Sequence, residues 1–179
     1  MRHPILGVPA FLDRRSIPKA KDWVPVLEAF VPVYLDGYGN ATLIYTDSMR
    51  FYVGMTAVRV YRTIARYYSI DIASLRRHFA AATHKSQSMP LVLSPRKLIL
   101  IPFRARTPRY KNDGAIGYVA DQCIRDIEPV ALKGRHAEGI RIVLQSGAEI
   151  VAPTSEELFG RHWQVARYFH YYLHTHTLL

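Results

Sequence analysis

The chain is poor in residues that build disulfides, cysteine-rich zinc sites and membrane-spanning helices. Among its 179 residues it has one cysteine, Cys123, which excludes an internal disulfide and suits a reducing cytosol. No apolar run reaches the roughly 20 residues that a transmembrane helix requires. We therefore expect a cytoplasmic protein that does not contact a membrane.

Catalytic motifs are also missing. The sequence contains no GxSxG, P-loop or GxGxxG pattern, and its acidic residues are too scattered for the carboxylate cluster of a divalent-metal nuclease. His170 and His174 have a spacing that zinc ligands use, but histidines near a helix C-terminus also complement the helix dipole. We expect no enzyme activity, no catalytic residue, no metal, no cofactor and no small-molecule substrate.

Acidic residues are few relative to basic ones. The chain has 24 Lys and Arg against 14 Asp and Glu, which gives a formal net charge of +10. Its hydrophobic content of 49% is that of a globular protein. The charge excess predicts attraction to nucleic acid or to an anionic membrane surface, and the preference for arginine favours nucleic acid.

The basic residues are densest in one stretch. The apolar run Leu98–Ile101 predicts a buried strand that ends at Pro102 and gives way to a cationic loop. The basic and polar residues in and before this loop are Arg96, Lys97, Arg104, Arg106, Arg109, Tyr110, Lys111 and Asn112. Charges this dense repel one another unless a polyanion or nearby carboxylates neutralise them. A solvated basic loop is the alternative, and the loop alone does not decide between the two.

Two short helices are predicted between residues 56 and 83. Thr56 and Asp71 are suitable N-caps. Arginines with helical spacing form a stripe on the first helix, and two more lie near the middle of the second. These residues are Arg59, Arg62, Arg66, Arg76 and Arg77. The connection between the helices is short and lacks glycine, which argues against a helix-turn-helix. The stripe is either a phosphate-contacting face or a solvated one.

Strand patterns surround this helix pair. The pattern predicts a meander over 30–35, 41–45 and 50–53, a strand over 116–120, and a hairpin over 140–152. A capping box at 154–157 opens a C-terminal amphipathic helix that we expect to pack on the sheet. The predicted fold class is α+β, with antiparallel hairpins around a central helix pair. Residues 1–25 are predicted to form a basic, proline-containing arm, and residues 26–179 a single DNA-binding domain.

Short motifs between residues 30 and 170 resemble, in their order and spacing, those of the ComK family, the competence transcription factors of Firmicutes. They are Val31-Pro32-Val33-Tyr34, the junction from Arg50 to Arg62, His84-Lys85 through Pro90, Ile101-Pro102-Phe103, Thr107-Pro108, the Ser146-Gly147 turn, Ser155, Gln164 and Arg167. The chain departs from the family at Ala115-Ile116, where members carry an aromatic residue, and at Leu75, where they carry glycine.

The resemblance implies a transcriptional activator located at the nucleoid. Such a protein binds paired A-rich and T-rich boxes in double-stranded DNA, largely through the minor groove, as dimers that pair on DNA. The resemblance also implies control by an adaptor that delivers the protein to a Clp protease, and a promoter of its own among the targets.

The loop chemistry agrees with such a target, because the minor groove of an A-tract is narrow, strongly negative and entered by arginine. We predict that Arg104, Arg106, Arg109 and Asn112 enter the groove and that Tyr110 offers a face for stacking. The residues predicted to hold phosphates on either side are Arg76, Arg77, Lys85, Lys97 and Lys111, with Arg96 beside them. Two other classes stay open: an RNA-binding or ribosome-associated module, and a scaffold whose basic loop meets an acidic partner.

Overall fold

The fold is built on two β-sheets. The computed structural model describes residues 10–12, 16–93, 98–132 and 138–176. The larger sheet has seven strands in the order β1-β4-β3-β2-β7-β6-β5, and the smaller has three in the order β10-β9-β8. The strands of the larger sheet are β1 (Ala10–Leu12), β2 (Leu27–Leu35), β3 (Gly39–Thr46), β4 (Arg50–Val53), β5 (Leu91–Leu93), β6 (Leu98–Arg104) and β7 (Ile116–Ala120). Those of the smaller sheet are β8 (Ile124–Ala131), β9 (Glu138–Leu144) and β10 (Glu149–Ala152).

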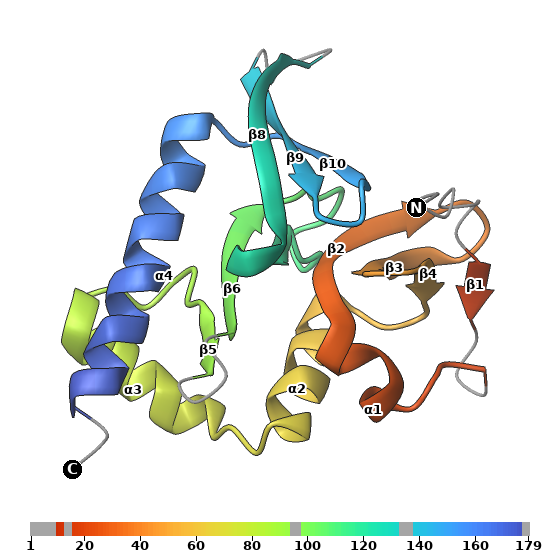
Figure 1. The fold of residues 1–179 in the computed structure, drawn as a ribbon. Helices are drawn as coiled ribbons and strands as arrows, with labels where there is room; N and C mark the ends of the chain where they lie inside the picture. Colours follow the sequence, from red (N-terminus) through yellow and green to blue (C-terminus); the bar gives the residue numbers. More distant parts are fainter. Residues whose placement is uncertain (1–9, 13–15, 94–97, 133–137, 177–179) are drawn as a thin grey trace.

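Four α-helices accompany the sheets. They are α1 (Ala20–Trp23), α2 (Ala57–Tyr67), α3 (Ile72–Thr83) and α4 (Glu156–His176). The long helix α4 runs beside β6 and β5, the helix pair lies at the opposite end from the smaller sheet, and β1 is at one edge (Figure 1). The predicted α+β class, antiparallel meander, central helix pair and C-terminal helix are all confirmed. In the described part of the chain, no helix combines the length and the apolar character needed to cross a membrane.

The local signals that start the helices work as predicted. The Thr56 side chain accepts a hydrogen bond from the Arg59 amide at 3.4 Å, and that of Asp71 accepts one from the Ala73 amide at 2.9 Å. Each cap satisfies an amide that has no partner within its helix. At the start of α4 the cap is Ser155.

The predicted end of strand β6, at Pro102, is wrong. The strand continues through Pro102 to Arg104, and Pro102 pairs with Tyr118 of β7. Strand β5 pairs only with residues 98–100, so it does not reach residue 102. Proline is tolerated there because no hydrogen bond to β5 requires an amide proton at that position. The Pro102 carbonyl instead accepts a hydrogen bond from Nδ1 of His162 on α4, at 3.0 Å. The basic loop therefore begins after Arg104.

Part of the predicted arm is attached to the body. Strand β1 pairs in parallel with β4, with Phe11 opposite Tyr52. Trp23 is only 2% exposed and belongs to the hydrophobic core. Residues 1–9 and 13–15 of the arm lie outside the described residues.

A buried carboxylate connects the two sheets. Glu28 of β2 is 3% exposed, and its Oε1 accepts a hydrogen bond from the Ser146 amide, in the turn between β9 and β10, at 2.9 Å. Burial raises the pKa of Glu28 above its ordinary value, bonding to Ser146 opposes that rise, and nearby Asp47 adds to it. The hydrogen bond fixes the smaller sheet against β2, whereas the burial of Glu28 makes its charged form unfavourable.

This raised pKa predicts a pH dependence of stability. Above the ordinary pKa of 4.5 the unfolded chain has lost the Glu28 proton, whereas the folded chain keeps it until its higher pKa is reached. The free energy of unfolding should therefore fall as pH rises through this interval. Replacement of Glu28 by Gln keeps an acceptor for Ser146 and should remove that fall.

Urea unfolding of the wild type and of Glu28→Gln between pH 4 and pH 8 measures the difference. The exposed Glu138→Gln is the matched control, and it should retain the wild-type slope. A wild-type stability advantage over Glu28→Gln that grows with pH would contradict the assignment.

Candidate nucleic-acid interface

The basic loop is the connection between β6 and β7, residues 105–115. It is closed at its base by the Ala105 amide, which donates to the Ala115 carbonyl at 2.8 Å. Just above, Arg106 Nε donates to the Gly114 carbonyl at 2.8 Å, and Nη2 donates to Oδ1 of Asn40 at 2.7 Å. Arg106 therefore joins the two sides of the loop and connects it to β3.

Tyr34, at the end of β2, is the second support of the loop. The guanidinium carbons of Arg106 and Arg109 lie 3.9 Å and 4.4 Å from the centre of its ring, a cation–π arrangement. Its hydroxyl donates to Oδ2 of Asp113 and accepts a bond from the Arg109 amide at 2.7 Å. The same carboxylate oxygen of Asp113 accepts from the Tyr110 amide at 3.3 Å. One tyrosine thus contacts Arg106, Arg109 and Asp113, which lie on both sides of the loop.

Arg106 acts as an internal cation in this arrangement. Burial lowers the pKa of Arg106, while Tyr34 and Asp113 raise it, yet a guanidinium remains charged at neutral pH. Its Nη1 is buried and has no hydrogen-bond partner among the described residues. We therefore assign Arg106 to positioning of the loop, and its predicted entry into a DNA groove stays a prediction.

The tip of the loop displays the side chains that suit a nucleic acid. Arg109, Tyr110, Lys111 and Asn112 are all exposed, and Tyr110 is 74% exposed. The loop's carboxylate, on Asp113, is turned inward to Tyr34. The outward surface of the tip is therefore cationic and aromatic.

Arg104 lies behind the tip on the face of the sheet that carries α2. It is half-buried and pairs with Ile116, two residues along from the Pro102–Tyr118 pair. Side chains two residues apart in a strand share a face, and the Tyr118 ring lies 5.1 Å from that of Tyr61 on α2. Arg104 and α2 are therefore on the same side of the larger sheet.

Arg76 of α3 lies at the same face. Burial raises the pKa of Tyr118 to about 12, and the charge of Arg76 acts in the opposite direction on both Tyr118 and Tyr61. The Arg76 guanidinium must therefore be near these phenols. Arg104 and Arg76 therefore lie on the same face of the larger sheet.

The helix pair is a second basic surface. Its arginines are exposed, and none forms an ion pair with a carboxylate in the part of the chain that the structure describes. They are Arg59, Arg62, Arg66, Arg76 and Arg77. Lys85 is also exposed, beside His162 in a separate pocket between α3 and α4. The predicted contacts Arg96 and Lys97 lie outside the described residues.

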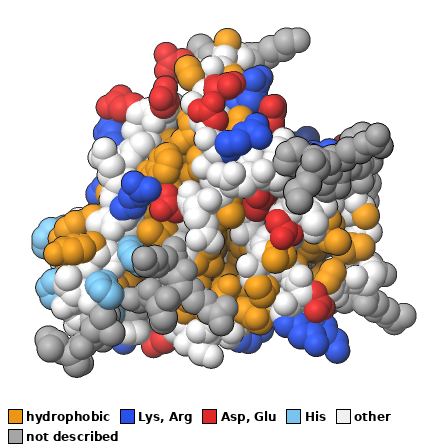
Figure 2. Space-filling view, in the orientation of Figure 1, with side chains coloured by type: hydrophobic (Ala, Val, Ile, Leu, Met, Phe, Trp, Pro, Cys, Tyr) orange, Lys and Arg blue, Asp and Glu red, His pale blue; other side chains and the backbone are white. Residues whose placement is uncertain are grey.

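Charge is distributed unevenly over the molecule. In Figure 2, many of the acidic side chains that this face shows gather around the smaller sheet and the start of α4. Strands β8–β10 carry four carboxylates and two arginines, Arg125 and Arg141, and Arg141 pairs with Glu128 at 3.0 Å. Among the described residues, basic side chains therefore outnumber acidic ones on the loop and the helix pair, and acidic ones outnumber basic ones on the strands of the smaller sheet.

Sequence reasoning identified the displayed residues of the loop but missed its supports. Tyr34 and Asn40 lie opposite each other in the β2–β3 hairpin. Their facing positions follow from the turn between them, which the sequence does signal. Their contact with Arg106, 66 residues from Asn40 along the chain, has no local signal.

The loop supports can be tested by removing one oxygen atom. In Tyr34→Phe the ring remains, but the bonds to Asp113 and to the Arg109 amide are lost, at a cost of about 1–2 kcal/mol. We expect trypsin to cleave after Arg109 and Lys111 at least five-fold faster than in the wild type, because local opening controls cleavage.

Tyr38→Phe, on the turn between β2 and β3, is the matched control and should leave the cleavage rate unchanged. If Tyr34→Phe is cleaved at the wild-type rate, its hydroxyl does not hold the loop.

Comparison with known proteins gives no relative for this arrangement. No family model matches the chain, and neither a curated protein nor a solved structure shows significant similarity to it.

Proposed function

We propose that this chain is a DNA-binding transcriptional activator of the competence-regulator type, which binds A/T-rich boxes in double-stranded DNA mainly through the minor groove. One observation carries the proposal. The loop is ordered by Tyr34 and presents Arg109, Tyr110, Lys111 and Asn112 outward, while the carboxylate of Asp113 faces inward.

An ordered loop is suited to a narrow groove. Holding the chain in its binding shape before contact lowers the conformational entropy lost on binding. Arg109 is then presented on a defined backbone, and the narrow A-tract groove attracts a guanidinium more strongly than a wide groove does. Asn112 adds an amide that can bond the acceptors on the groove floor, which distinguish A·T from G·C and little more.

Phosphate contacts belong to the surrounding cations. Lys111 at the tip and the arginines of the helix pair are exposed and unpaired within the described residues, so binding to phosphates breaks no ion pair there. Such contacts fix the orientation of the protein without reading sequence. They also predict a steep dependence of affinity on salt.

The remaining parts of the proposal rest on the resemblance to the ComK family. They are the pairing of homodimers on DNA, delivery to a Clp protease by an adaptor, and location at the nucleoid.

The proposal is tested by fluorescence anisotropy at two salt concentrations. One duplex contains an A-run and a T-run, and a second duplex of equal length has G·C in their place. The wild type should bind the A/T duplex at least ten-fold more tightly. Equal affinity for both duplexes would contradict minor-groove selection, and tighter binding of structured RNA would favour the RNA-binding class.

Two loop variants separate sequence reading from charge. Arg109→Lys keeps the charge but loses the planar guanidinium, so the A/T preference should fall several-fold while the salt slope stays constant. Lys111→Ala should weaken both duplexes alike and reduce the salt slope by about 1.

Lys21→Ala removes one exposed charge from α1 and is the matched control, with little expected effect on either duplex. If Arg109→Lys and Lys111→Ala weaken both duplexes by the same factor, the groove assignment of Arg109 is wrong.

A further inference from the structure

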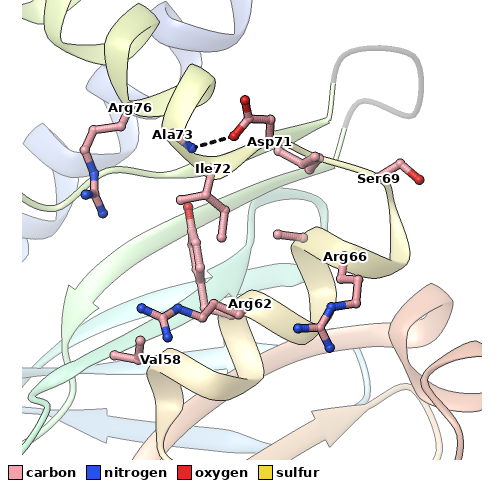
Figure 3. Close-up of a pocket in the computed structure, with 11 residues that line it drawn as sticks. Val58, Arg62, Arg66, Ser69, Asp71, Ile72, Ala73 and Arg76 are labelled. Atoms are coloured by element: carbon pink, nitrogen blue, oxygen red, sulfur yellow. Dashed lines mark hydrogen bonds between the residues drawn. The ribbon is translucent and has the colours of Figure 1, made fainter.

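The two helices of the central pair border an open pocket that is separate from the basic loop. The pocket has a volume of about 720 Å³ and lies between α2 and α3. Three arginines line it: Arg62 and Arg66 from α2, and Arg76 from α3. In Figure 3, Arg62 and Arg76 extend from their two helices on the same side of the pocket, and Arg66 lies farther along α2.

The charge in this pocket is largely unneutralised. Among the described residues, Asp71 is the single carboxylate that lines it, and its Oδ1 already accepts a hydrogen bond from the Ala73 amide at 2.9 Å as the cap of α3. None of the three arginines forms an ion pair with any carboxylate that the structure describes. Guanidinium groups that face a common space without counter-charge favour an anion with several acceptor oxygens.

A buried polar group in the pocket wall is also without a partner. Tyr61 lines the pocket and is 8% exposed, and its hydroxyl has no hydrogen-bond partner among the described residues. Burial raises the pKa of Tyr61 above its ordinary value, so the hydroxyl is a donor at neutral pH. A buried donor without an acceptor costs free energy, and an anion beside Arg76 would supply the acceptor.

Most of the rest of the lining is apolar, with Ser69 as the polar exception. Val58, Ala65, Ile70 and Ile72 complete the wall between the charged groups. A free inorganic anion would leave this apolar surface uncovered. A volume in the range of small-molecule sites, about 300–1,000 Å³, leaves room for an apolar or planar group attached to the anion.

We propose that the pocket between α2 and α3 binds an organic phosphate, in which a phosphate monoester lies between Arg62 and Arg76 and a planar group of nucleoside size covers the apolar wall. This site goes beyond the proposed DNA contacts: it shares its arginines with the phosphate contacts proposed for the helix pair, but none of its lining residues belongs to the loop. A ligand there would compete with backbone phosphates for Arg76, so its concentration would modulate DNA binding.

Isothermal titration calorimetry of the full chain with adenosine monophosphate tests this site, with adenosine and inorganic phosphate as separate probes at matched ionic strength. We expect adenosine monophosphate to bind at least ten-fold more tightly than either probe. The double variant Arg62→Gln/Arg76→Gln should lose at least ten-fold in that affinity.

Arg59→Gln/Arg77→Gln removes the same two charges from the same two helices outside the pocket, and should stay within two-fold of the wild type. Equal losses in the two double variants would overturn the site, because the overall positive charge of the helix pair would then explain the binding. Binding of inorganic phosphate as tight as that of the nucleotide would overturn it as well, and so would an absence of nucleotide binding.

The same variants separate this inference from the DNA proposal. Lys111→Ala should bind adenosine monophosphate like the wild type even though it weakens duplex binding. If Arg62→Gln/Arg76→Gln weakens duplex binding and the nucleotide does not bind the wild type, the pocket is a backbone-phosphate contact and the organic-phosphate site is wrong.

Discussion

The arrangement of the basic surface depends on the contact between Tyr34 and the loop above it. Arg106 and Arg109 would repel each other if both were free, but both guanidinium groups lie over the Tyr34 ring. The Tyr34 hydroxyl donates to the Asp113 carboxylate and accepts a hydrogen bond from the Arg109 amide. With Arg106 placed inside as a support, Arg109 and Lys111 at the tip remain exposed, although the Arg109 guanidinium also lies against the Tyr34 ring. Contacts with Tyr34 and Asp113 therefore reduce the repulsion between the cations of the loop, and the tip stays accessible to a ligand.

The larger sheet makes this local arrangement part of a wider surface. Strand β6 begins beside β5 and α4 and ends at the loop, and its pairing with β7 places Arg104 on the face that carries the helix pair. Arg76 lies at the same face near Tyr118. The strands of the smaller sheet carry more carboxylates than arginines, so among the described residues their charge is opposite in sign to that of the loop and the helix pair. A single polyanion could contact the loop and the helix pair while avoiding the smaller sheet.

The elements that could be predicted from the sequence are those with local causes. Thr56, Asp71 and the Ser146–Gly147 turn act through neighbours within a few residues, and each does what its pattern indicates. The prediction that the strand ends at Pro102 failed because β6 tolerates proline only where β5 no longer pairs with it. No local sequence pattern shows how far β5 extends. The exposed loop residues were recognisable by charge density, but the inward role of Arg106 depends on Tyr34 and Asn40, which are distant in sequence.

The central claim is that the basic loop is already ordered before any ligand binds. Amide hydrogen exchange of Arg109 and Asp113, in the free protein and with an A/T duplex, tests it most directly. Both amides donate hydrogen bonds in the unliganded structure, to the Tyr34 hydroxyl and to the Tyr110 carbonyl, so we predict protection in the free protein that a duplex increases only slightly. Exchange at unstructured-peptide rates in the free protein, with protection gained only on binding, would contradict the account.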